Sequence, residues 1–163
     1  MEPLPPSAFD AGAVARAAAA ALEDARQAIG VKRTALFWLD AAQGRLKCVA
    51  TAGPGDRDRW VGQTLATNLG MAGRAVREGH PVWTPDLLAD PRVPIAPWLR
   101  ERLEAENLRT VAAAPVRVDG AISGALGFLD GPGRTYDERA LERLGRLADE
   151  MAARVARTSR RES

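Results

Sequence analysis

The sequence has one cysteine, one histidine and one tyrosine among its 163 residues. The lone Cys48 has no partner for an intrachain disulfide, which excludes the small disulfide-stabilised secreted class. His80 is the only histidine, and zinc sites combine several histidine or cysteine ligands, so we expect no metal site. No stretch approaches the ~18 apolar residues of a membrane helix, and none has a signal-peptide pattern. We therefore expect a cytoplasmic protein without a membrane partner.

The sequence also lacks an excess of charge of either sign. Its 23 lysines and arginines face 21 aspartates and glutamates, which leaves a formal charge of +2. Such a balance gives no strong field toward a polyanion, so we expect no nucleic-acid partner. A hydrophobic fraction of 46% in a chain of this length suits one compact domain. We assign residues 1–10 to a flexible leader, 11–158 to the domain and 159–163 to a polar tail.

Two long helices are predicted near the ends of the chain. Residues 11–29 are rich in alanine, and residues 136–158 follow a capping box made by Thr135 and Glu138. Both have apolar side chains at the spacing of three and four residues that places them on one helix face. The two stripes consist of Val14, Ala18, Ala21, Ala25 and Ala28, and of Leu141, Leu144, Ala148, Met151 and Val155. Such faces suit packing on a sheet, on a partner helix, or on both.

Between these helices the pattern favours strands. The predicted strands are residues 33–39, 45–52, 81–85, 110–118 and 121–129. Asp119 and Gly120 separate the last two and form the strongest hairpin signal in the chain. A short helix is expected at 71–78, and a proline-rich cover with a helix at 98–107. Strands joined in hairpins, with helices kept apart from them, indicate an α+β fold with an antiparallel sheet.

Three segments in this order resemble the GAF domain family of small-molecule sensors over residues 11–158. They read GMAGRAVREGHPVWTPDLLADPR, VAAAPVRVDGAISGALGFLDG and YDERALERLGRLADEMAARVA. The resemblance implies a PAS-related, antiparallel sheet of five or six strands with the terminal helices on one face and a loop-covered pocket on the other. It also implies a homodimer through the terminal helices and an output domain or partner signalling protein that receives the ligand state.

The ligand-binding residues that this resemblance favours are Trp60, Trp83, Thr84, Asp86 and Trp98, which lie in or beside the predicted cover. Apolar walls with a few polar groups are typical of ligand cavities. Each residue also has a structural interpretation: the tryptophans can fill space beside small-residue strands, and aspartate often caps its own turn. The identity of the ligand stays open.

Cofactor and catalytic roles are disfavoured. Gly70 and Gly73 match neither a dinucleotide fingerprint nor a P-loop. His80 could ligate haem, but it lies in a turn that suits a solvent-facing side chain. Cys48 could carry a bilin or act as a reductase nucleophile, yet it has neither an adjacent histidine nor a second cysteine, and a strand cysteine is usually a buried hydrophobe. The Asn-Lys pair of cyclic-nucleotide GAF domains is missing.

The sequence thus predicts a sensory or regulatory module that binds a small molecule, signals through dimeric terminal helices and has no catalysis of its own. Two alternatives stay open. One is an enzyme similar to free methionine-sulfoxide reductase, and the other is a ligand-free dimerisation module whose own side chains fill its pocket.

Overall fold

The computed structural model describes residues 11–162; the predicted leader and Ser163 lie outside the described residues. The elements are α1 (Ala11–Ile29), β1 (Arg33–Asp40), β2 (Arg45–Ala52), the 3-10 helix η2 (Arg57–Arg59), β3 (Thr64–Ala66), α2 (Gly70–Glu78), β4 (Val82–Thr84), α3 (Pro97–Glu106), β5 (Thr110–Val118), β6 (Ala121–Asp130) and α4 (Glu138–Glu162).

The six strands form one antiparallel sheet in the order β3-β2-β1-β6-β5-β4. The hairpins β1–β2 and β5–β6 meet where β1 pairs with β6, with Leu36 opposite Leu126. The predicted α+β class and both hairpins are confirmed. The three-residue strand β3 was not predicted, since Thr64–Ala66 is too short to show an alternating pattern.

The tight turn between β5 and β6 follows from its two residues. Asp119 and Gly120 have φ angles of 52° and 82°, as a two-residue turn with two left-handed residues requires. Glycine has no Cβ to oppose this conformation, and aspartate tolerates it better than most residues. The turn therefore joins β5 and β6 directly as an antiparallel pair.

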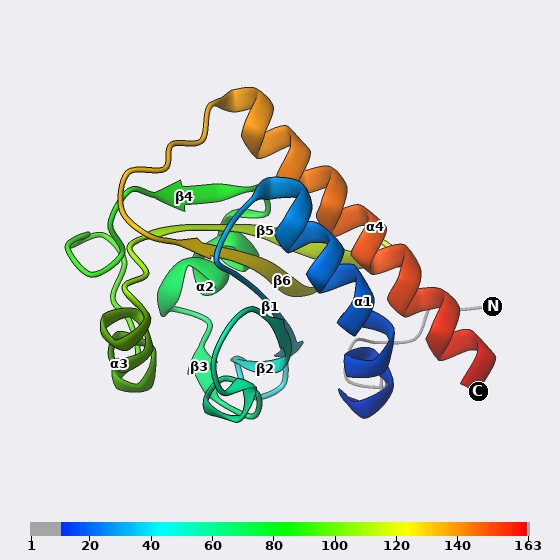
Figure 1. The fold of residues 1–163 in the computed structure, drawn as a ribbon. Coiled ribbons are helices and arrows are strands. Elements are labelled where there is room, and N and C mark those ends of the chain that lie inside the picture. Colours follow the sequence, from blue (N-terminus) through cyan, green and yellow to red (C-terminus); the bar gives the residue numbers. More distant parts are fainter. Residues whose placement is uncertain (1–10, 163) are drawn as a thin grey trace.

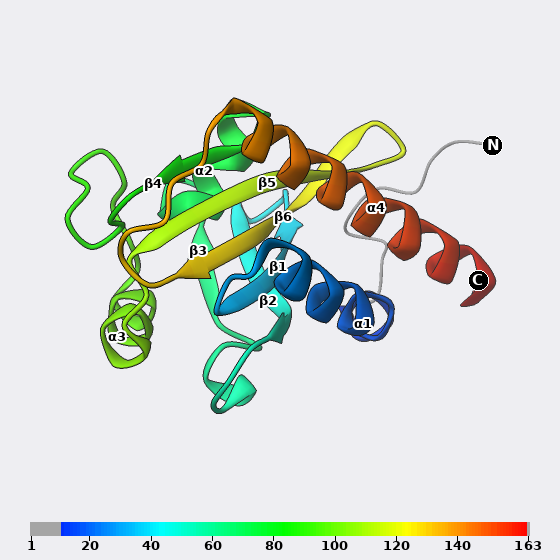
Figure 2. The same ribbon diagram turned by 45° about the horizontal axis from the view of Figure 1, so that its top comes forward.

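The sheet separates two hydrophobic cores, because alternate side chains of each strand point to opposite faces. In β1, Leu36 and Trp38 pack into the core under α1 and α4, whereas Ala35 and Phe37 pack into the core on the other face. Figure 1 shows α1 and α4 lying side by side across one face, with α2 on the other. Figure 2 shows α3 near the start of β5 and the end of β6, away from α1. This arrangement places the predicted cover opposite the terminal helices.

The terminal helices differ from prediction in detail. Leu22 lies in the buried face of α1, whereas Ala28 is exposed. The capping box is wrong: α4 begins at Glu138, and the Oδ1 of Asp137 accepts a 2.8 Å hydrogen bond from the backbone N–H of Ala140. An aspartate next to the helix start captures the free N–H before a more distant threonine can. Helix α4 also runs on through residues 159–162, so this part of the predicted tail is helical. Among residues 11–162, no helix combines the length and hydrophobicity that crossing a bilayer requires.

Candidate functional site

A small apolar cavity lies between the sheet, α2 and α3. Its volume is about 20 Å³, and its lining includes Met71 from α2, Leu99 from α3, and Phe37 and Val111 from the sheet. A cavity needs roughly 10–15 Å³ to hold one water molecule, whereas drug-sized ligands occupy pockets of about 300–1,000 Å³. The cavity therefore has room for little more than one water, and a larger ligand requires its walls to move.

Helix α2 forms one of these walls and is held close to the preceding loop by Gly73. A Cβ at this position would lie 2.5 Å from the backbone oxygen of Thr67. The helix ends at Gly79, whose φ of 77° gives the left-handed cap predicted from the sequence. Gly73 therefore allows α2 to pack closely against the preceding loop, and Gly79 ends the helix.

Helix α3 closes the cavity through side-chain contacts. Leu99 and Leu103 are buried in the core on the face of the sheet opposite α1 and α4. The indole N–H of Trp98 donates a 2.7 Å hydrogen bond to the backbone oxygen of Thr64, and its ring meets Trp60 edge to face at 5.8 Å. Trp98, a residue of α3, therefore packs against Trp60 where the sequence predicts the cover.

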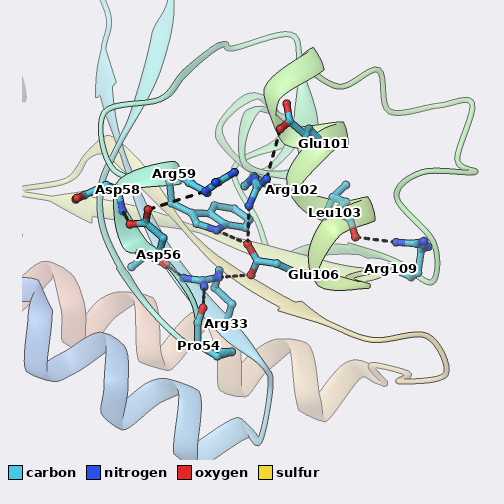
Figure 3. Close-up of polar contacts among 12 residues, drawn as sticks. Arg33, Pro54, Asp56, Asp58, Arg59, Glu101, Arg102, Leu103, Glu106 and Arg109 are labelled. Atoms are coloured by element: carbon cyan, nitrogen blue, oxygen red, sulfur yellow. Dashed lines mark hydrogen bonds and ion pairs between the residues drawn. The ribbon is translucent and has the colours of Figure 1, made fainter.

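The carboxylate of Glu106 forms the polar attachment of α3 (Figure 3). Its Oε1 accepts a 3.0 Å hydrogen bond from Nε of Arg33, and its Oε2 accepts a 2.7 Å bond from the indole N–H of Trp60. Nη1 of Arg102 lies 3.8 Å from the same Oε2. Arg33 is only 1% exposed, so its charge is buried and needs this partner. The cluster joins β1, the η2 loop and the end of α3.

Other contacts fix the Arg33 guanidinium in place. Its Nη1 donates a 2.8 Å hydrogen bond to Thr51, its Nη2 donates to the backbone oxygen of Pro54, and its Cζ lies 4.9 Å from the centroid of the Trp60 ring. A Cβ on Gly53 would lie 3.2 Å from that Cζ. Sequence reasoning missed Arg33 and Glu106 because arginine is abundant in this chain. The available signal was an arginine at the head of an otherwise apolar strand.

Two polar residues among the predicted site residues support the cover loop from within. The hydroxyl of Thr84 donates a 2.7 Å hydrogen bond to Asp90, and Oδ1 of Asp86 accepts a 3.1 Å bond from the N–H of Leu88. The second bond is a turn closed by an aspartate, the structural interpretation given above. These contacts hold the loop between β4 and α3.

Trp83 lies on the opposite face of the sheet. It packs against the core under α1 and α4, and its ring meets Tyr136 at 5.7 Å. Its neighbours in β4, Val82 and Thr84, are buried, which is the alternation of a strand. None of the five predicted residues lines the cavity: Trp60 and Trp98 pack against each other beside it, and Trp83 lies on the other face of the sheet.

The loop contact at Asp90 predicts a pH dependence of stability. Hydrogen bonds from Arg92, and then from Thr84, hold the pKa of the Asp90 carboxyl well below its usual range. A lowered pKa gives stability that is complete above the unfolded value of about 4 and is lost as the pH falls below it. We expect Asp90→Asn to lose about 1–2 kcal/mol at pH 7, from weakened charged hydrogen bonds. Urea unfolding should show this difference shrinking between pH 4 and pH 2, and an equal difference at pH 7 and pH 2 would contradict the assignment.

The two candidate cofactor residues lie outside the cavity lining. His80 is exposed, with its Nε2 3.8 Å from Glu78. Cys48 is fully buried in β2, its thiol lies 3.6 Å from the backbone oxygen of Ala50, and burial raises its pKa to about 12. A thiol with this pKa is protonated at neutral pH, and the thiolate is the reactive form. Residues 11–162 contain no group of three or more histidine, cysteine, aspartate or glutamate side chains that could hold a metal ion.

A six-stranded antiparallel sheet with terminal helices on one face and a covered cavity on the other defines the class of GAF-like α+β domains. The sequence profile of the GAF domain matches residues 13–156, and the chain belongs to this family. No curated protein sequence matches the chain.

Solved structures share the fold. The second GAF domain of DevS from Mycobacterium smegmatis has a TM-score of 0.68 and 21% identity over 94% of this chain and 100% of its own. The GAF domain of a phosphoenolpyruvate-protein phosphotransferase from Coxiella burnetii has a TM-score of 0.74 and 20% identity over 91% and 86%. The free methionine-R-sulfoxide reductase from Neisseria meningitidis, solved with its substrate, has 0.71 and 21% over 94% and 83%.

Proposed function

We propose that this domain is a cytoplasmic sensory module that binds a small molecule in the cavity beneath α3, has no catalysis of its own, and passes the state of the cavity to α1 and α4. The observation that carries the proposal is the small apolar cavity with Leu99 of α3 in its wall. Because the cavity has only about 20 Å³, a ligand must displace the cover to enter. Binding and movement are then coupled, since a ligand shifts an equilibrium by its differential affinity for the two states.

A chain of contacts connects the cover with α4. Asp90 in the cover loop bonds Thr84, and the adjacent Trp83 packs on Tyr136, which lies two residues before α4 begins. Movement of the cover would therefore pull on β4 and change the packing of Trp83 beneath the start of α4. Such a contiguous set of packed groups is a physical route for coupling two faces of a domain.

The coupling can be tested by filling an enlarged cavity. Leu99→Ala should create apolar space that binds benzene, as engineered apolar cavities do. We expect saturating benzene to raise the melting temperature of this variant and to change amide hydrogen exchange in residues 136–158. Leu22→Ala opens space in the core that α1 shares with α4, so it is the positive control: benzene bound there should change exchange in α4 directly. Benzene that binds Leu99→Ala without altering exchange in α4 would contradict a sensory role.

The small volume of the cavity favours a second candidate, a ligand-free dimerisation module. Native mass spectrometry of the purified protein separates the two, because a retained small molecule supports the sensor. A ligand-free protein whose Leu99→Ala variant does not bind benzene supports the second candidate. The reductase alternative would need Cys48 as its nucleophile, and that thiol is buried and protonated. If Cys48→Ser turns over free methionine sulfoxide as fast as the unaltered protein, the reductase alternative is excluded.

We further propose that the domain forms a homodimer through α1 and α4 and serves an output domain or partner signalling protein. A groove between these helices is lined by Ala21, Ala28, Leu147 and Met151 together with the charged side chains of Asp24, Glu150 and Arg154. Its alanines would let a partner helix approach closely. The named neighbours of similar fold include GAF domains of a phosphotransferase and a DevS protein, which fits a module joined to an output.

The dimer yields a direct prediction. Ala28→Arg places a bulky charge at an exposed position of the groove, so it should raise the dimer dissociation constant by about tenfold or more without unfolding the monomer. Analytical ultracentrifugation measures this change. Ala105→Arg, on the exposed face of α3, is the matched control and should leave the dissociation constant unchanged. Equal behaviour of the two variants would place the interface elsewhere.

A further inference from the structure

We infer that Arg33 and Trp60 form a receptor for a carboxylate, that Glu106 occupies it in the closed domain, and that the ligand is a small carboxylic acid with an apolar body that displaces Glu106. This inference rests on the proposed sensory function and names the class of its ligand. The donors of the receptor are the guanidinium Nε–H of Arg33 and the indole N–H of Trp60.

The receptor engages both oxygens of a carboxylate. Arg33 donates to Oε1 at 3.0 Å and Trp60 donates to Oε2 at 2.7 Å, and Arg102 lies 3.8 Å from Oε2. Hydrogen bonds in which both groups are charged are among the strong ones in proteins, and a second donor adds orientation. The same geometry serves a carboxylate from any source, whether it belongs to a side chain or to a free molecule.

Glu106 is more exposed than the two residues that bind it, so it is the member of the cluster that can leave. Arg33 is 1% exposed and Trp60 is 0% exposed, whereas the side chain of Glu106 is 22% exposed at the last residue of α3. A carboxylate at the C-terminal end of a helix is unfavourable, because the helix dipole is negative there. The helix dipole therefore does not favour Glu106 at this position. Its hydrogen bonds are those with the receptor, and its contact within α3 is the 3.8 Å ion pair with Arg102.

The receptor would persist when Glu106 departs. Arg33 stays bonded to Thr51 and to the backbone of Pro54, and it lies over the Trp60 ring. A receptor whose groups are already held in place loses little conformational entropy when it binds. The donors would be uncovered in the geometry that a second carboxylate needs.

The apolar body of the ligand follows from the position of Glu106 on α3. The same ten-residue helix contributes Leu99 to the cavity wall and Glu106 to the receptor. Displacing α3 therefore opens apolar space and frees the donors together. Glu106 is a tethered competitor, and tethered groups act at effective concentrations of about millimolar, so free acids must combine both contacts to displace it.

The test uses hexanoate as the probe and hexanamide as its uncharged counterpart. Glu106→Gln removes the charge of the competitor at nearly constant shape. We expect this variant to bind hexanoate at least about tenfold more tightly than the unaltered protein, because a competing charged contact is weakened. Isothermal titration calorimetry gives the constants. Glu104→Gln, on an exposed position of the same helix, is the matched control and should bind hexanoate as the unaltered protein does.

Three outcomes would overturn the inference: no gain of hexanoate affinity in Glu106→Gln, an equal gain in Glu104→Gln, or equal binding of hexanamide. Adding Arg33→Met to Glu106→Gln should abolish the gain. If Glu106→Gln unfolds, hexanoate but not hexanamide should restore its near-ultraviolet circular dichroism, and failure to do so counts against the receptor. The benzene experiment on Leu99→Ala involves no carboxylate, so the receptor can fail while the sensory function stands.

Discussion

Gly124→Ala is expected to destabilise the domain by about 3 kcal/mol or more, or to prevent folding. A Cβ at this position in β6 would lie 2.2 Å from the backbone oxygen of Phe37 and 3.2 Å from the ring of Trp38. Overpacking commonly costs about 1–3 kcal/mol, and here the obstacle is the backbone of the neighbouring strand β1, which cannot rotate aside. Urea unfolding followed by circular dichroism measures the loss.

Gly127→Ala supplies the matched control in the same strand. Its Cβ would have no neighbour nearer than 3.7 Å, which is an ordinary van der Waals contact. Alanine also suits a strand better than glycine does, so the free energy of unfolding should change by less than about 1 kcal/mol. Similar losses of stability in the two variants would contradict the prediction that the close approach of β1 is the reason why Gly124 cannot carry a Cβ.

Glu106→Leu is expected to lower the free energy of unfolding by about 2–3 kcal/mol. The change leaves the buried Arg33 charge without its carboxylate, and breaking a buried pair commonly costs about 3–5 kcal/mol. We expect less because Arg33 keeps Thr51 and Pro54 as partners and the Glu106 side chain is 22% exposed. Chemical denaturation measures the loss, and Glu104→Leu on the exposed side of α3 should stay within about 0.5 kcal/mol.

A double-variant cycle separates the ion pair from general packing. Arg33→Met combined with Glu106→Leu removes both charges, so the double variant should lose at least about 1 kcal/mol less than the sum of the single losses. Strict additivity would mean that Arg33 and Glu106 stabilise the domain independently, and α3 would then be held by its leucines and Trp98.

The sequence predicted those parts of the fold that depend on local patterns. The Asp119 and Gly120 turn, the left-handed end of α2 at Gly79 and the apolar stripe of α4 each follow from a few neighbouring residues. The start of α4 was missed because Asp137 competes for the same N–H group. Which of two nearby side chains caps a helix depends on the three-dimensional path of the chain.

The site was harder to predict because its contacts join residues far apart in the chain. Arg33 and Glu106 are separated by 73 positions, and no local pattern connects them. Trp83 was grouped with the other tryptophans by its position near the cover, but the alternation of β4 turns it to the face under the terminal helices. A three-residue strand is too short for its inward face to be assigned from sequence. The cavity volume likewise depends on packing that the sequence does not specify.

The two edges of the sheet bear on how this domain can associate with other chains. Both edge strands, β3 and β4, have only three residues, and prolines flank β4 on each side. Short edge strands offer few free backbone groups for another strand to pair with, and the prolines beside β4 stop its extension, which protects against fibre growth. Backbone pairing between copies is therefore suppressed at both margins. Side-chain surfaces such as those of the helices are left as the means of selecting a partner, and a change there can alter partner choice without inviting aggregation.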